Sequence, residues 1–144
     1  MAEIGSEQAI ERARQALGVA ESVSGQALRV ERLDVPGAAY FLVLLAGHAG
    51  GHAIAAIDAR TGSVSESAEL AGSEPQLMVN EQQAIAAARL GGAVSARLVW
   101  RPSRASRSPL YPIWECTSET QRRFIDQQGQ VWDDLQTAGR GGGS

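Results

Sequence analysis

Cysteine is nearly absent from this sequence, since Cys116 is the single cysteine among 144 residues. One cysteine excludes an internal disulfide and any metal cluster that several cysteines would hold. No apolar run approaches the roughly 18 residues of a membrane-spanning helix, so we expect no membrane span. The N-terminal residues also lack the basic and apolar regions of a signal peptide. The sequence as written therefore predicts a cytoplasmic protein, or an exported one if a signal peptide has been removed.

Lysine is absent altogether, and all 13 basic residues are arginines. A GC-rich codon bias would produce this composition without any chemical role for it. The net charge of −3 disfavours a general nucleic-acid binder, but it conceals an asymmetry between the halves of the chain. Residues 1–74 carry ten acidic residues and five arginines, whereas residues 75–144 carry six acidic residues and eight arginines.

The clearest positive feature is an internal repeat. Three segments of the first half return in the second in the same order: residues 7–14 (EQAIERAR) as 82–89 (QQAIAAAR), residues 40–43 (YFLV) as 111–114 (YPIW), and residues 57–64 (IDARTGSV) as 125–131 (IDQQGQV). The first pair aligns Ile10 with Ile85, and the last pair has a turn that is one residue shorter in the second half. A helix signal, an aromatic strand and an Asp-turn-Gly strand thus occur twice, which indicates two copies of one supersecondary unit.

Both predicted helices are short and rich in alanine. Ser6 is a good N-cap for the first helix, and Gly18 is placed to end it. Asn80 and Gln83 have the spacing of a capping box at the start of the second helix, which runs to Gly91. Their narrow apolar stripes predict that each helix lies flat against a sheet. Turn residues then delimit the expected strands, at 27–34, 38–46, 52–59 and 63–66 in the first half and at 94–101, 110–117, 120–126 and 130–135 in the second.

These elements predict an α+β fold made of two tandem units, each a helix followed by an antiparallel meander. A lone unit would leave a sheet face or edge poorly covered, so we expect the two units to pack together as one body. The expected boundaries are 1–67 for the first unit, 68–79 for a linker, 80–137 for the second unit and 138–144 for a flexible tail.

The repeated unit resembles the PepSY domain. The resemblance rests on residues 40–43 and 55–64 (AAIDARTGSV) in the first half, and on Tyr111 and residues 124–131 (FIDQQGQV) in the second. The second copy departs from the pattern by losing the threonine and one residue of the turn. PepSY domains look like small non-catalytic modules, found in protease propeptides and in exported or membrane-anchored proteins. The resemblance implies a binding or inhibitory role, with no catalytic residues to carry across.

The segment of residues 101–109 (RPSRASRSP) carries three arginines at three-residue spacing. With other arginines and aromatic residues nearby in the sequence, they form a candidate patch for an anion or an acidic peptide. The residues that we expect to contact a partner are Arg101, Arg104, Arg107, Trp114 and Arg122. Charged hairpin loops are common on protein surfaces, so solvated arginines without a partner are the simpler alternative.

The other chemically active side chains do not form a recognisable site. His48 and His52 flank a Gly-rich turn, but no Cys, Asp or Glu lies beside them in the sequence to complete a metal site. Cys116 ends an apolar strand and has no neighbouring histidine to form a thiolate, so we interpret it as a small buried residue. We therefore expect no catalytic residues, no metal and no cofactor.

The favoured interpretation is a non-enzymatic binding or inhibitory module that recognises a protein or peptide, with nucleic acid disfavoured and a homodimer left open. An exposed sheet edge would allow such a partner to add a strand. The main alternative is a small enzyme or ligand-binding protein of cystatin-like fold, with a pocket between helix and sheet lined by His52, Tyr111 and Cys116. A structural assembly subunit is a third alternative, and it would need a large apolar surface patch.

Overall fold

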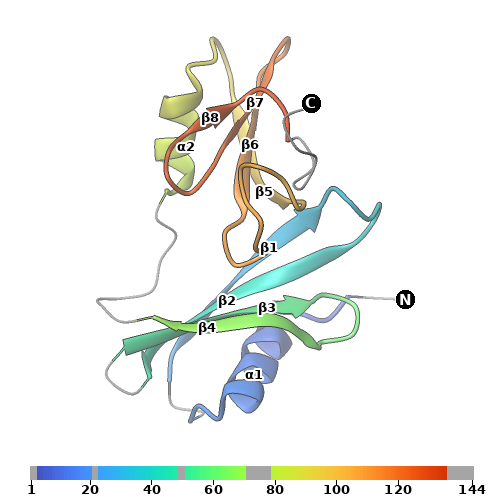
Figure 1. Ribbon diagram of the computed structural model, residues 1–144, viewed down its shortest axis with the longest axis vertical. Coiled ribbons are helices and arrows are strands. Elements are labelled where there is room, and N and C mark those ends of the chain that lie inside the picture. Colours follow the sequence, from blue (N-terminus) through green and yellow to red (C-terminus); the bar gives the residue numbers. More distant parts are fainter. Residues whose placement is uncertain (1–2, 21–22, 49–50, 71–78, 136–144) are drawn as a thin grey trace. The chain divides into compact units, whose positions relative to one another are not determined.

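The computed structural model describes residues 3–20, 23–48, 51–70 and 79–135. The chain divides into two compact units, of which the first comprises residues 1–31 and 37–76 and the second comprises residues 32–36 and 77–144. Each unit has one helix followed by four strands (Figure 1). The α+β class predicted from the sequence is confirmed, because each helix packs on its own set of strands.

The first unit begins with a helix and continues as an antiparallel meander. Its elements are α1 (Ser6–Leu17), β1 (Gly25–Arg32), β2 (Ala39–His48), β3 (Gly51–Asp58) and β4 (Val64–Leu70), with the last residue of β1 counted in the second unit. Each strand pairs antiparallel with the next along the chain. The fourth strand is longer than its predicted span of 63–66, because β3 supplies backbone partners for it as far as Leu70, opposite His52.

The second unit repeats this order with shorter strands. Its elements are α2 (Glu81–Ala88), β5 (Ser95–Trp100), β6 (Ile113–Thr117), β7 (Arg122–Ile125) and β8 (Val131–Trp132), again paired antiparallel in chain order. The last strand is much shorter than predicted. It ends where the exposed acidic residues Asp133 and Asp134 begin, and aspartate is depleted in strands.

The sequence predicted two of the four helix ends, namely the start of α2 and the end of α1. The predicted end of α2 at Gly91 was wrong, because the helix stops at Ala88 and Arg89 caps it in the left-handed conformation with a φ of 53°. Asn80 and Gln83 form the predicted capping box: the Asn80 carbonyl oxygen Oδ1 accepts from Gln83 N–H at 2.8 Å, and Asn80 N–H donates to Gln83 Oε1 at 2.9 Å. Gly18 ends α1 with a φ of 67°. The prediction that Ser6 caps α1 was wrong: Gly5 is the N-cap, because its N–H is bound by Gln8 Oε1 at 3.0 Å.

The helices use alanine to approach their strands. The fully buried residues of α1 are Ala9 and Ala13, and those of α2 are Ala84 and Ala88, which are the same two positions of the repeat. The alignment of Ile10 with Ile85 therefore predicted the buried face of both helices. In the first unit these alanines meet alternate residues of β2 and β3, namely Phe41, Val43, Leu45, Ala53, Ala55 and Ile57.

The equivalence of Ile57 and Ile125 predicted by the repeat is confirmed. Both are completely buried, the first beneath α1 and the second beneath α2. The cross-strand partner of Ile57 is Phe41, whereas that of Ile125 is Trp114. Trp114 is therefore the counterpart of Phe41, two residues later than the predicted alignment. A shift of two residues keeps the same face of the strand towards the helix.

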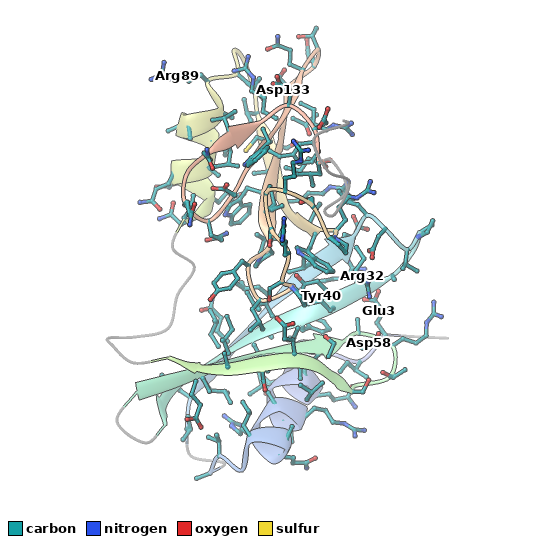
Figure 2. The ribbon with its side chains drawn as sticks, viewed as in Figure 1. Glu3, Arg32, Tyr40, Asp58, Arg89 and Asp133 are labelled. Atoms are coloured by element: carbon teal, nitrogen blue, oxygen red, sulfur yellow. The ribbon has the colours of Figure 1, made fainter. Side chains whose placement is uncertain are left out.

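The turns that follow these isoleucines are also equivalent. Asp58, labelled in Figure 2, lies at the turn after β3, and its Oδ1 accepts from the N–H groups of Arg60 and Thr61 at 2.8 and 2.9 Å. Asp126 Oδ1 accepts from Gln128 N–H and Gln130 N–H, both at 2.9 Å. Each turn also holds a glycine with positive φ. The repeat therefore extends to the chemistry of the turn.

A second apolar cluster lies on the opposite face of the second unit from α2. Its buried members are Val99, Ile113, Phe124 and Leu135, with Leu33, Ala105 and Trp132 packed against them. Ala105 comes from the segment between β5 and β6, so this cluster attaches that segment to the strands.

Some predictions concern residues outside the described part of the chain. Residues 71–78 of the predicted linker and all of the predicted tail, 138–144, belong to this group. The side chains of His48 and His52 also lie outside it, so the candidate histidine pair stays a prediction.

Candidate partner-binding site

The connection between β5 and β6, residues 101–112, is held by hydrogen bonds among its own serines, and we call it the arginine loop. Ser103 N–H donates to the carbonyl oxygen of Ser106 at 3.0 Å, and Ser106 N–H donates to the Ser103 hydroxyl at 3.3 Å. Ser103 is completely buried, and Ser106 is 8% exposed. A buried hydroxyl with partners avoids the desolvation cost that an unpaired one would carry. The loop therefore has an internal polar scaffold.

The Ser106 hydroxyl connects β5 to the start of β6. It accepts from Trp100 Nε1 at 3.3 Å, and it lies 2.6 Å from the carbonyl oxygen of Tyr111 and 3.0 Å from that of Ser108. A hydroxyl donates one proton at a time, and the shorter distance favours Tyr111 as its acceptor. The position of Tyr111 is therefore set by a hydrogen bond from within the loop.

Ala105 turns inward between two arginines that stay exposed. It packs with Val99, Ile113 and Phe124, whereas Arg104 and Arg107 are exposed. A small apolar side chain anchored on the strands thus holds the backbone from which both guanidinium groups project.

The turn after β7 faces the arginine loop and is held by hydrogen bonds to Asp126. Besides its two backbone donors, the carboxylate of Asp126 accepts from Trp132 Nε1 at 2.9 Å, through Oδ2. Both carboxylate oxygens are therefore engaged, and Asp126 is buried. Charge-assisted hydrogen bonds of this kind are stronger than neutral ones, which favours a fixed carboxylate.

Gln127 connects this turn to two other segments of the unit. Its Oε1 accepts from Val79 N–H at 3.0 Å, and its Nε2 donates to the carbonyl oxygen of Pro112 at 3.0 Å. In the first unit the equivalent contact is a backbone one, from Ile4 N–H to the carbonyl oxygen of Ala59 at 2.7 Å. The side chain of Gln127 therefore replaces a backbone bond and also attaches the arginine loop at Pro112.

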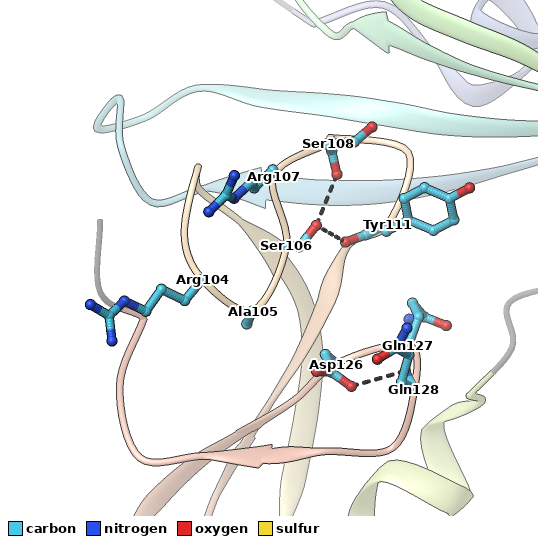
Figure 3. Close-up of a pocket in the computed structure, with 9 residues that line it drawn as sticks. All are labelled: Arg104, Ala105, Ser106, Arg107, Ser108, Tyr111, Asp126, Gln127 and Gln128. Atoms are coloured by element: carbon cyan, nitrogen blue, oxygen red, sulfur yellow. Dashed lines mark hydrogen bonds between the residues drawn. The ribbon is translucent and has the colours of Figure 1, made fainter. Parts of the chain in front are cut away.

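A pocket of about 570 Å³ lies between the arginine loop and the Asp126 turn (Figure 3). This volume is within the range of small-ligand sites, roughly 300–1,000 Å³. Tyr111, which is 46% exposed, forms part of the wall. The lining residues are Arg104, Ala105, Ser106, Arg107, Ser108, Tyr111, Asp126, Gln127 and Gln128.

The wall of this pocket has an excess of positive charge. Arg104 and Arg107 contribute two guanidinium groups, and Asp126 contributes the one carboxylate among the lining residues. Each guanidinium presents five N–H donors in a planar fork that matches a carboxylate or a phosphate. Chemically, the arrangement can hold an anionic group beside an exposed aromatic ring.

Arg101 lies apart from this pocket, at the start of the arginine loop. Its positive charge acts on Asp34, which also receives hydrogen bonds from Arg32 at 2.6 and 3.0 Å. Burial alone would raise the pKa of Asp34, but these hydrogen bonds and the charges of Arg32 and Arg101 together hold it below its ordinary value. Of the three loop arginines predicted to contact a partner, Arg104 and Arg107 line the pocket.

Trp114 and Arg122, the other two predicted contact residues, lie on opposite faces of the strands. Trp114 is half-buried among the residues beneath α2, and its Nε1 donates to the carbonyl oxygen of Val79 at 2.8 Å. Arg122 is exposed on the face of Phe124, 5.4 Å from that ring centre, with an ion pair to Glu115 at 3.7 Å. One flat surface cannot contain both residues, and neither lines the pocket.

Cys116 has the environment expected of a structural residue. It is completely buried beneath α2 with Ala84 and Ala88. Burial raises the pKa of its thiol, and the charges of Glu81 and Glu115 raise it further, so the thiol is protonated at neutral pH. Tyr111 lines the pocket, whereas Cys116 is not among the lining residues. Among the described residues, no group of three His, Cys, Asp or Glu side chains is placed to hold a metal.

The Asp126 turn was not predicted from the sequence as a wall of the site. Asp126, Gln127 and Gln128 were recognised only as the turn of the second repeat. One signal was present, because glutamine at position 127 replaces Ala59 of the first copy, and the exchange of an apolar for a polar side chain marks a place where the copies differ.

Comparisons with known proteins give no family assignment. No protein-family model matches this chain, and the comparison with curated proteins gives no match, so the resemblance to PepSY domains is not confirmed. The chain is similar to the crystal structure of a putative lipoprotein from Clostridium difficile 630, at 16% sequence identity and a TM-score of 0.40, over 92% of each chain. In the part of the chain that the structure describes, neither helix is long and apolar enough to cross a membrane.

Proposed function

We propose that this protein is a non-enzymatic binding module that recognises an acidic segment of a protein or peptide partner in the pocket beside the arginine loop. The observation that carries the proposal is the pocket itself, which joins two exposed arginines to an aromatic ring that is 46% exposed. Arginine and tyrosine are enriched at protein interfaces, where they supply both charge and apolar area.

The scaffold of the pocket supports a binding role. The Ser103–Ser106 hydrogen bonds, the inward Ala105 and the Gln127 contact to Pro112 hold the walls without a ligand. A preformed site loses less conformational entropy on binding, so more of the interaction free energy appears as affinity.

The pocket residues give less support to catalysis. Ser106 is the one buried serine among the lining residues, and its hydroxyl already bonds to Trp100 and Tyr111. No base activates this hydroxyl in the described structure. The alternative of a cystatin-like enzyme or ligand-binding protein requires Tyr111 and Cys116 to line one pocket, yet Tyr111 lines the pocket beside the arginine loop and Cys116, buried beneath α2, does not. The PepSY-like sequence pattern of both repeats favours a binding or inhibitory role as well.

Isothermal titration with a short glutamate-rich peptide tests the proposal. Replacing Arg104 and Arg107 with Ser should weaken binding by at least about tenfold, because the pocket loses both cationic groups. The wild-type affinity should also decrease as the salt concentration is raised, since exposed charges are screened beyond about 8 Å at physiological ionic strength.

The matched control is the double variant Arg12→Ser and Arg60→Ser. It removes the same charge from two exposed positions of the first unit, and it should leave the affinity within about twofold of wild type. Equal losses in both double variants would show a non-specific charge effect and would contradict the proposal. So would an affinity that depends on neither salt nor Arg104 and Arg107.

A further inference from the structure

Val79, the residue before the N-cap of α2, is held by two side chains of the second unit. Its N–H donates to Gln127 Oε1 at 3.0 Å, and its carbonyl oxygen accepts from Trp114 Nε1 at 2.8 Å. Val79 is itself buried, so the loss of either bond would leave a buried backbone group without a partner. The position of the helix start therefore depends on these two side chains.

Gln127 joins Val79 to the pocket through one planar amide group. While its Oε1 accepts from Val79, its Nε2 donates to the carbonyl oxygen of Pro112 at 3.0 Å. Both bonded atoms belong to the same rigid group, so a rotation of this amide breaks both bonds together. Gln127 is buried, and it is also one of the residues that line the pocket, on the turn shown in Figure 3. The group that holds the start of α2 is therefore part of the pocket wall.

From Pro112 the connection continues into the arginine loop. Pro112 is completely buried and follows Tyr111, whose carbonyl oxygen lies 2.6 Å from the Ser106 hydroxyl. Tyr111 and Ser106 line the pocket as well. One series of contacts therefore runs from Val79 through Gln127 to the loop that forms the other wall.

The first unit shows the simpler form of this connection. There the N–H of Ile4 donates directly to the carbonyl oxygen of Ala59 at 2.7 Å. Ile4 and Val79 each directly precede a helix N-cap, and are therefore equivalent. Ala59 and Gln127 each directly follow the aspartate of a turn. The second copy thus places an amide side chain where the first copy has a bond between two backbone atoms, and it is the second copy that has the pocket.

We infer that Gln127 couples the pocket to the start of α2, so that a ligand bound in the pocket suppresses local opening at Val79. The inference rests on the proposed function and adds a regulatory connection to the same site. An opening that breaks the bonds of Gln127 also removes part of the pocket wall, so a ligand binds the closed form and stabilises it. By reciprocity, a change that displaces Val79 weakens the binding of the ligand. Val79 is the last residue of the linker predicted from the sequence, so the coupling would connect the pocket to the chain between the two repeats.

Amide hydrogen exchange followed by NMR tests the inference, with and without the glutamate-rich peptide. At about one hundred times its Kd, a ligand that binds the closed form alone lowers the open population about a hundredfold. Exchange at Val79 N–H should therefore slow by at least about tenfold, whereas the N–H groups of Ile4 and Ser118 should change by less than about twofold. Ile4 is the equivalent residue of the first unit. Ser118 lies at the far end of β6 from the pocket, where its N–H donates to the carbonyl oxygen of Gln121 at 2.9 Å.

The variant Gln127→Met separates the coupling from the rest of the pocket. It keeps an unbranched side chain and removes both hydrogen bonds of the amide. Exchange at Val79 N–H should then be faster, and its response to peptide at about one hundred times the variant's own Kd should fall below about twofold. The matched control Gln130→Met makes the same substitution at an exposed residue of the same turn, outside the pocket, and should keep the wild-type response.

Peptide binding without slower exchange at Val79 would overturn this inference and leave the proposed function standing. So would equal slowing at Val79 and Ser118, because the peptide would then stabilise the whole unit, and so would a full response in Gln127→Met. If Gln127→Met does not fold, the comparison of Val79 with Ser118 in the wild-type protein decides the question alone. A peptide that does not bind at all would overturn the proposed function and this inference with it.

Discussion

At the scale of single residues, two aspartates carry out the same task in the two halves of the chain. Asp58 and Asp126 each follow a completely buried isoleucine, and each accepts two backbone N–H groups of the turn that begins there. An ionised carboxylate satisfies both donors at once, which no apolar side chain could do. In the second half the same residue also contributes the fixed negative charge of the pocket wall.

The pKa of Asp58 leads to a prediction about acid stability. Burial alone would raise this pKa, but the hydrogen bonds from the N–H groups of Thr61 and Arg60 outweigh burial and hold it below its ordinary value. Because the pKa of Asp58 is lower in the folded protein than in the unfolded chain, the ionised carboxylate stabilises the folded state at pH values above the unfolded-state pKa of about 3.9. This stabilisation is lost as the pH falls through the folded-state pKa. Asp58→Asn should therefore lower the free energy of unfolding by about 1 kcal/mol at pH 7 and by much less near pH 3.

Urea unfolding at both pH values measures this difference. The control is Glu119→Gln, an exposed acidic residue for which we expect a change within about 0.5 kcal/mol at either pH. If Asp58→Asn lowers the free energy of unfolding by the same amount at neutral and acid pH, the prediction is contradicted, because the charge of the side chain would then make no difference to stability.

At the scale of elements, the short helices depend on alanine at the positions that face the strands. Ala9 and Ala13 in α1, and Ala84 and Ala88 in α2, are all completely buried. A helix with methyl groups at its contact positions can lie closer to a sheet than one with branched side chains. Residues Ala84 and Ala88 meet Cys116 and Ile125, so this part of the second core is closely packed.

Enlarging one contact alanine of α2 should destabilise the second unit. Ala84→Leu should reduce the free energy of unfolding by about 1–3 kcal/mol, because three added carbon atoms must be fitted against Cys116 and Ile125. The control Ala86→Leu adds the same atoms at an exposed position of the same helix and should change stability by no more than about 0.5 kcal/mol. Equal effects of both substitutions in thermal or urea unfolding would contradict the assignment of the buried face.

The sequence predicted those elements whose signals are local. The capping box at Asn80 and the helix end at Gly18 depend on residues within one turn, and the repeat reproduced the buried helix positions in both halves. The faces of Trp114 and Arg122 depend on the register between β6 and β7, which no local signal specifies. The alignment of Tyr40 with Tyr111 was wrong because Pro112, which cannot donate a ladder bond, delays the start of β6.

At the scale of the whole molecule, the two copies of the unit differ mainly in one connection. Residues 33–38 join β1 to β2, whereas residues 101–112 join β5 to β6 and carry Arg104, Arg107 and Tyr111. The pocket is therefore a feature of the second copy, in the half of the chain with more arginines than acidic residues. The sequence indicated this loop by its charge, but its serine scaffold and its turn partner depend on contacts between distant residues.

Amide NMR spectra recorded during titration with the glutamate-rich peptide test the proposed site most directly. The account predicts that shifts concentrate at the N–H groups of residues 104–108, 110–111 and 126–128, on both walls of the pocket, and that Arg104→Ser with Arg107→Ser abolishes them at the same peptide concentration. Shifts that concentrate elsewhere, such as along β4, or that persist in the double variant, would contradict it.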